Sequence, residues 1–138
     1  MSAAHSAERR KLKLIKLSLE NVIAEFTRLT GADSEQVTQE LSLIENAFHL
    51  INGLLDERKC TSGDISRAEY AAAAYAFYDY ICKENAKNKV ICTLTGKASA
   101  DTSYRSRIES AASLKASALE TIKPVTKGCD FIFKAMEG

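Results

Sequence analysis

The residues able to bind a metal or to act as acid–base catalysts are few in this chain and lie far apart. There are two histidines, His5 near the N-terminus and His49, and His49 has a carboxylate one helical turn away, at Glu45. A di-iron helical bundle needs Glu-x-x-His on two helices together with further inward-facing glutamates. The Glu45–His49 spacing differs from that motif and has no second copy. We therefore expect a surface pair, with no metal and no cofactor.

The sequence shows no motif for nucleophilic catalysis either. Four cysteines are scattered along the chain: Cys60, Cys82, Cys92 and Cys129. They form no Cys-x-x-Cys motif, which argues against zinc ribbons and covalent haem, and none has a histidine close in sequence that would serve as its base. Thr95-Gly96-Lys97 lacks the earlier glycine of a phosphate-binding loop. We predict that the protein is not an enzyme and that its thiols are reduced in the cytoplasm.

A cluster of basic residues near the N-terminus is the sharpest charge signal. It consists of Arg9, Arg10, Lys11, Lys13 and Lys16. A helix dipole disfavours cations in the first turns, so the cluster does not serve helix stability. One interpretation is contact with nucleic acid, anionic lipid or an acidic partner. The other is solvated charge that pairs with the acidic segment 33–59. Leu14 and Leu17, which point away from the apolar stripe of the helix expected over 6–30, are also expected partner contacts.

Aromatic residues are concentrated between positions 70 and 80: Tyr70, Tyr75, Phe77, Tyr78 and Tyr80. Successive residues of a helix are rotated by about 100°, so these rings cannot all share one buried arc. We expect Tyr70, Phe77 and Tyr78 in the core. Tyr75 and Tyr80 are expected at an interface, because tyrosine combines a large apolar area with a hydrogen-bonding group.

The elements that must position these residues are helices, and segment 33–59 has the clearest helical pattern. Its apolar residues form two rows: Val37, Leu41, Ile44, Phe48, Ile51 and Leu55 in one, and Leu43, Ala47, Leu50 and Leu54 in the other. Steps of three and four keep each row on one side of a helix. Together the rows cover about half of the circumference, more than on an ordinary surface helix. We expect part of this surface to be covered by a second neighbour or by another chain.

Periodicity predicts further helices over 6–30, 66–95 and 102–123. Gly31 is expected to end the first, a Ser66–Glu69 capping box to begin the third, and Pro124 to end the fourth. The β-branched run 90–95 also fits a strand, but no partner strand is visible, so we predict helix there. The apolar tail, with Phe131 and Phe133, predicts a short helix over 128–136 that docks on another surface.

Length and composition are those of one globular domain, with 138 residues, 46% hydrophobic and 27% charged. The net charge of +1 gives no general attraction to nucleic acid or membranes. No apolar run reaches the roughly 18 to 20 residues that span a bilayer. The predicted architecture is an all-α antiparallel four-helix bundle with a short C-terminal helical tail.

The function that these features favour is protein–protein contact, as an adaptor, inhibitor, chaperone or assembly subunit. A homodimer would use the same surfaces. The expected contacts are the basic cluster, Leu14, Leu17, Tyr75, Tyr80, Phe131 and Phe133. The alternative is a nucleic-acid-binding protein that uses the basic face of the first helix. A third hypothesis places a small ligand between helices, among the tyrosines.

Overall fold

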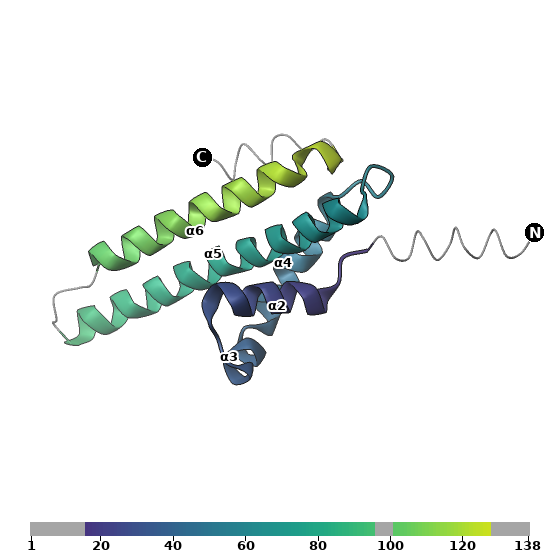
Figure 1. Ribbon diagram of the computed structural model, residues 1–138. Coiled ribbons are helices and arrows are strands. Elements are labelled where there is room, and N and C mark those ends of the chain that lie inside the picture. The colour runs from purple at the N-terminus through teal and green to yellow at the C-terminus, as the bar shows by residue number, and fades with distance from the viewer. Residues whose placement is uncertain (1–15, 96–100, 128–138) are drawn as a thin grey trace, which may run out of the picture.

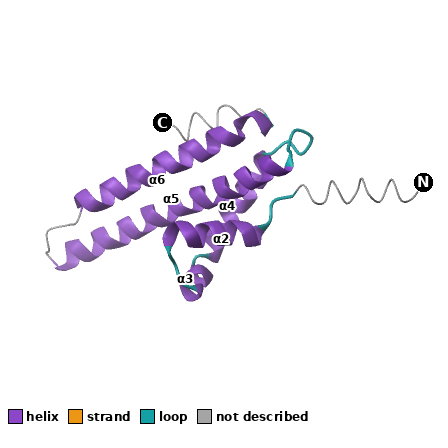
Figure 2. Cartoon of the chain, in the orientation of Figure 1, coloured by secondary structure: helices purple, strands orange, loops and turns teal. Residues whose placement is uncertain are grey.

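The computed structural model describes residues 16–95 and 101–127, with side chains for 16–87 and 105–127. Within these ranges the chain is helical (Figure 2), which confirms the all-α class. The elements are α2 (Leu19–Thr30), α3 (Ser34–Gln39), α4 (Leu41–Leu54), α5 (Ser62–Thr95), α6 (Asp101–Ile122) and the 3₁₀ turn η1 (Lys123–Val125). The expected tail helix over 128–136 lies outside the described residues.

Helix α5 is the centre of the arrangement. It packs against α2, α4 and α6, and α2 also contacts α4. In Figure 1, α6 runs back alongside α5, whereas α2 and α4 cover only the half of α5 nearer to Ser62. The described contacts are therefore organised around one long helix.

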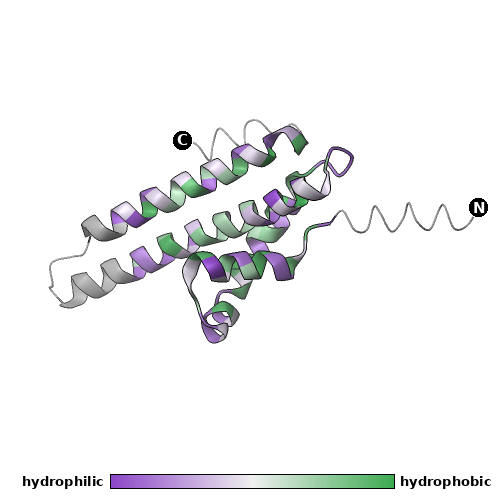
Figure 3. Cartoon of the chain, in the orientation of Figure 1, coloured by the Kyte–Doolittle hydropathy of each residue, from purple (hydrophilic) through white to green (hydrophobic). Residues whose placement is uncertain are grey.

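Small side chains allow α5 to be enclosed in this way. Six alanines of the helix have no exposed surface: Ala68, Ala71, Ala72, Ala73, Ala74 and Ala76. Four consecutive residues of an α-helix point to all sides of it, so the 71–74 turn is covered all round. In Figure 3 this part of α5 is pale green, between a more polar start of the helix and a more polar stretch that precedes the part drawn in grey. A methyl group contributes little volume, so the neighbouring helices can approach the α5 backbone closely.

Helix α2, the first helix among the described residues, does not extend back to residue 16. Residues 16–18 precede α2, and Ser18 is its N-cap, with its hydroxyl accepting the Asn21 backbone N–H. The prediction of helix over 6–30 is therefore wrong for 16–18, and 6–15 lie outside the described residues. Gly31 ends α2 as expected, at φ 69°, where a residue without Cβ is favoured.

The predicted Ser66–Glu69 capping box is wrong, because α5 already begins at Ser62. Glu69 is buried, at 6% exposed, and interacts with α2 instead. Its carboxylate accepts the Ser18 backbone N–H at 2.7 Å and the Asn21 side-chain N–H at 3.2 Å. Glu69 thus holds the start of α2 against α5.

The continuous helix predicted over 33–59 is also wrong. The Asp33–Gln36 capping box starts α3 as expected, but α3 ends at Gln39, and α4 follows after Glu40. Glu40 is buried, and Lys83 of α5 donates to both of its carboxylate oxygens, at 2.8 and 2.9 Å. Glu40 and Lys83 are 43 residues apart in the sequence, and their contact fixes the chain at the point between α3 and α4.

After α4 the chain becomes extended. Leu55 forms an isolated antiparallel bridge with Thr126. The Asp56 N–H donates to the Val125 carbonyl at 2.8 Å, and the Lys127 N–H donates to the Leu54 carbonyl at 2.9 Å. These bonds tie the end of α4 to the segment that follows α6. They explain why the helix does not continue to position 59.

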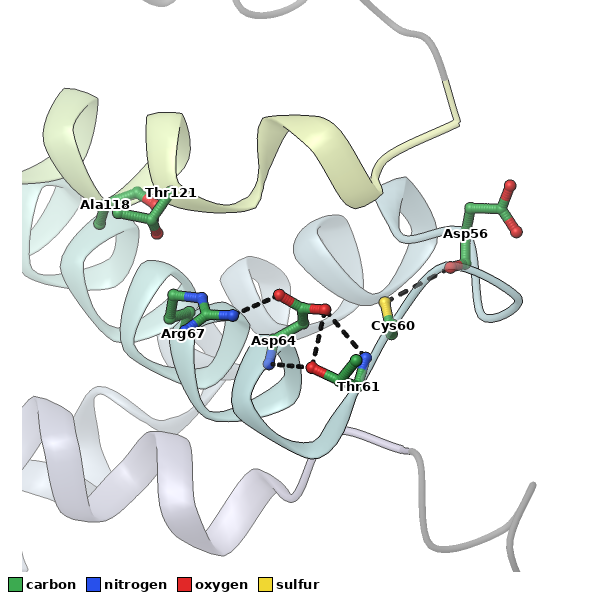
Figure 4. A network of polar contacts seen from close by, with 7 residues as sticks. All are labelled: Asp56, Cys60, Thr61, Asp64, Arg67, Ala118 and Thr121. Carbon is green, nitrogen blue, oxygen red and sulfur yellow. Dashed lines mark hydrogen bonds and ion pairs between the residues drawn. The ribbon is translucent and has the colours of Figure 1, made fainter.

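Figure 4 shows the start of α5, where Thr61 and Asp64 cap it reciprocally. The Thr61 N–H and hydroxyl both donate to Asp64 Oδ2 at 2.9 Å, and the Asp64 N–H donates to the Thr61 hydroxyl. Arg67 donates to Asp64 Oδ1.

At its other end α5 reaches Thr95, so the segment 90–95 is helical as predicted. The fourth predicted helix, 102–123, corresponds to α6, with Pro124 in η1.

We expect the Asp64 cap to make stability pH-dependent in the acidic range. The Thr61 backbone N–H, followed by Arg67 and the Thr61 hydroxyl, lowers the pKa of Asp64 from 3.8 to about 2. Because the native pKa lies below the unfolded value, this stabilisation is present above pH 3.8 and is lost as pH falls toward about 2. Asp64→Asn should lower the unfolding free energy at neutral pH, measured in urea. The difference from the wild type should vanish near pH 2, and the exposed-site control Glu57→Gln should show no such trend. A difference that does not change with pH would contradict this assignment.

Enlarging a buried alanine of α5 should destabilise the fold. Ala73 has no exposed surface, whereas Ala86 of the same helix is exposed. We expect Ala73→Leu to lower the unfolding free energy by about 1–3 kcal/mol through overpacking. The matched substitution Ala86→Leu should change it by less than about 0.5 kcal/mol. Equal stability of the two variants in chemical denaturation would show that α5 is not enclosed.

Candidate functional site

The apolar surface of α4 is only partly covered. The residues at the centre of its apolar arc, Ile44, Ala47, Ile51 and Leu54, are buried. Leu41 and Phe48 lie at one edge of the arc, and Leu43 and Leu50 lie at the other, as the 100° rotation per residue requires. All four edge residues are half-buried. We call Leu41 with Phe48 the first margin of α4, and Leu43 with Leu50 the second margin.

Each predicted row of α4 is therefore split between core and margin. The core face lies between the two rows, against α5 and α2, so each row contributes its inner members to the core and its outer members to a margin. The ring of His49, which is exposed, meets the Phe48 ring edge-on at 5.2 Å and shields part of it. Neighbours within the described chain thus leave the margins of α4 half open.

A second notable group lies between α5 and α6, around Lys115. Lys115 belongs to the α6 row that includes the buried residues Ala111, Ala118 and Ile122, and is itself only 9% exposed. Its ammonium lies 3.8 Å from the centre of the Tyr78 ring and 5.2 Å from that of Tyr75. These are cation–π distances. The two half-buried tyrosines therefore stabilise a positive charge at a position where apolar side chains are usual.

Asp79 of α5 is the acidic residue whose charge influences Lys115. Burial lowers the pKa of Lys115, and the charge of Asp79 opposes that change. Burial likewise raises the pKa of Asp79, against the influence of Lys115. Burial is the larger cause in both groups, so each charged form is less favourable in the folded chain than in water. Burial, followed by the charge of Asp79, also raises the pKa of Tyr75, which keeps its hydroxyl protonated.

The sequence analysis did not identify Lys115. The position of Lys115 in the sequence could have indicated its burial. It lies four residues after Ala111 and three before Ala118, on the apolar row of the helix. A lysine at such a position costs stability and can specify which helices pair and in what register.

The structure describes only Lys16 of the predicted basic cluster. Lys16 is exposed, whereas Arg9, Arg10, Lys11, Lys13 and Leu14 lie outside the described residues. The prediction that Leu17 is a surface contact is wrong, because it is 6% exposed and part of the core. Leu17 directly precedes the N-cap Ser18. An apolar residue at this position often packs against the fourth residue of the helix. In α2 that fourth residue is the buried Val22.

Arg105 and Arg107, the basic residues that could extend such a site, are exposed on α6. They belong to the part of α6 near Asp101, which lies at the opposite end of the molecule from the start of α2 (Figure 1). The described residues therefore do not form one basic face with Lys16.

The tyrosines expected at an interface both pack within the chain. Tyr75 and Tyr80 are half-buried against the core. The Tyr80 ring meets the buried Phe26 ring of α2 edge-on, with centres 5.8 Å apart. Contacts within the chain thus account for part of the surface of each ring, and their role in partner binding stays a prediction. Phe131 and Phe133 lie outside the described residues.

Among the described side chains, Cys60 and Cys82 are free thiols. Burial, with added repulsion from Asp64, Asp56 and Glu57, raises the pKa of Cys60 and keeps it protonated. Residues 16–95 and 101–127 contain no group of three or more metal-binding side chains. None of the helices in the same ranges is long and apolar enough to cross a membrane.

Comparisons with protein-family models, with curated proteins and with solved structures give no match for this chain.

We expect Lys115→Met to be tolerated or mildly stabilising. Methionine keeps apolar contact with the tyrosine rings and removes a buried charge, so the unfolding free energy at pH 7 should rise by between zero and about 1 kcal/mol. The native pKa of Lys115 lies below the ordinary 10.5. The wild type should therefore regain stability relative to the variant as pH rises toward 10.5. Urea denaturation at several pH values measures this difference. Lys59→Met, at an exposed lysine, should show no such trend, and a pH-independent loss of stability in Lys115→Met would contradict the assignment.

Proposed function

We propose that this chain acts by protein–protein contact, as a helical interaction protein whose binding element is α4. The observation that supports the proposal is the pair of half-buried margins on either side of the buried arc of α4. An adaptor, an inhibitor, a chaperone and an assembly subunit would all use such a surface. We place this activity in the cytoplasm, in keeping with the free thiols of Cys60 and Cys82.

The margins suit a partner because their position is set by the core. Ile44, Ile51 and Leu54 anchor the inner face of α4, so little conformational entropy is lost when a partner covers the outer edges. Full burial of a leucine or phenylalanine contributes about 1.5–3 kcal/mol relative to full exposure. Completing the burial of the two half-covered residues of one margin would contribute about 2 kcal/mol, more than tenfold in affinity.

The spacing within each margin favours a helix as the partner element. Leu41 and Phe48 are seven residues apart, as are Leu43 and Leu50. Seven residues span two helical turns, about 10.5 Å, which is the repeat at which a second helix places its own apolar side chains. An amphipathic helix lying along one margin would fit this pattern. A second copy of the chain could supply that helix, so a homodimer is one form of the same proposal.

Polar substitution of the margins tests the proposal. Light scattering on the purified chain measures its mass in solution, and affinity purification from the native host recovers its partner. We expect Leu41→Gln and Leu50→Gln to weaken the resulting complex, or the homodimer, at least tenfold. Asn46→Gln, at an exposed polar position on the face of α4 opposite the apolar arc, serves as the matched control and should bind as the wild type does.

Circular dichroism must show that the leucine variants remain helical and fold cooperatively. The proposal fails if folded Leu41→Gln and Leu50→Gln both bind with wild-type affinity. It also fails if the chain is monomeric and no protein from the host binds it.

A further inference from the structure

A polar pocket of about 290 Å³ lies between α3 and α5. It is lined by Gln36, Gln39, Glu40, Tyr80, Lys83, Glu84 and Lys87. Each of these side chains carries a hydrogen-bonding group, and no aliphatic residue of the described ranges lines the pocket. The volume is at the lower end of the range for small-molecule sites, about 300–1,000 Å³. The pocket therefore suits a small and strongly polar molecule.

Two of the lining residues, Glu40 and Lys83, form an ion pair. The Glu40 side chain is 10% exposed, and Lys83 donates to both of its oxygens at 2.8 and 2.9 Å. The pair joins the α3–α4 break to the middle of α5. Because the two charges neutralise each other, the pair adds no net charge to the lining of the pocket.

The walls are also held in place. The Tyr80 ring packs edge-on against the buried Phe26. Burial and the nearby charges of Glu84 and Glu40 raise the pKa of Tyr80, which keeps its hydroxyl as a donor. The Gln36 side-chain oxygen accepts the Asp33 N–H of the α3 cap, so its NH₂ group remains available to donate. Tyr80 and Gln36 thus offer donors whose positions are restrained before any ligand arrives.

Two opposite charges at the pocket have no ion-pair partner among the described residues. Glu84 and Lys87 make no ion pair with any residue in the described ranges. They are three residues apart on α5, so their side chains leave the helix from neighbouring positions. A ligand that satisfies both must carry an ammonium for Glu84 and a carboxylate for Lys87. A phosphate or another simple anion would meet the carboxylate of Glu84 unfavourably.

We propose that this pocket binds a free α-amino acid as its zwitterion. Lys87, the Gln36 amide and the Tyr80 hydroxyl donate to the carboxylate, and Glu84 accepts from the ammonium. The neutral total charge of the lining matches a ligand that carries one charge of each sign. This site is separate from the α4 margins, so it is a second binding function and does not depend on the first.

NMR titration of the ¹⁵N-labelled full chain tests the proposal, with glycine, L-alanine, L-glutamine and L-glutamate as probes. We expect saturable shifts for at least one of them, with a dissociation constant of about 1 mM or tighter. The shifts should include the side-chain amides of Gln36 and Gln39. Acetate and methylammonium each carry half of the zwitterion, and should bind at least tenfold more weakly.

Glu84→Gln and Lys87→Met each remove one charge and should weaken binding by roughly tenfold to a hundredfold. Glu57→Gln and Lys59→Met are the matched controls, because they remove exposed charges in the turn after α4, away from the pocket. The proposal is overturned if no amino acid gives saturable shifts at the pocket, or if acetate or phosphate binds as tightly as the zwitterion. Wild-type affinity in folded Glu84→Gln and Lys87→Met would overturn it as well.

Discussion

Close approach of helices to the α5 backbone is the constraint on which the rest of the structure depends. Between positions 71 and 74 every side chain of α5 is buried, so neighbours cover the helix on all sides. Only small side chains permit this, because the separation of packed helices depends on the residues at their contact. The alanines bring α2, α4 and α6 to one axis, and larger residues such as Ile44, Phe26 and Ile122 fill the spaces between them.

The alanine contacts of α5 between positions 68 and 76 resemble one another and specify little about register. Polar groups supply that information at three places on the helix. Glu69 binds the start of α2, Lys83 binds Glu40 at the α3–α4 break, and Lys115 of α6 lies over Tyr75 and Tyr78. Each contact joins α5 to a different neighbour, and a shift of one helical turn would leave a charged group without its partner. Such groups cost stability when misplaced, so they favour one arrangement of the helices.

The two proposed binding functions follow from this arrangement. The inner face of α4 packs against the core, which leaves two apolar margins at its edges. The short helix α3 lies beside a polar part of α5, and the two helices line a pocket. The Glu40–Lys83 pair is common to both, because it lies at the break that lets α3 and α4 take different directions. A protein partner and a small zwitterion would therefore contact neighbouring but chemically different surfaces.

The sequence by itself determined the features that depend on neighbours within a few residues. The all-α class, the end of α2 at Gly31, the Asp33–Gln36 cap and the wide apolar arc of α4 all follow from local spacing. Only the tertiary structure decided the break at Glu40, the use of Glu69 by α2 and the burial of Lys115. It also decided which leucines of α4 stay half open and which polar side chains meet in the pocket. The physical reason is that these outcomes depend on partners 43 to 51 residues away or on another helix, and periodicity along one helix carries no information about them.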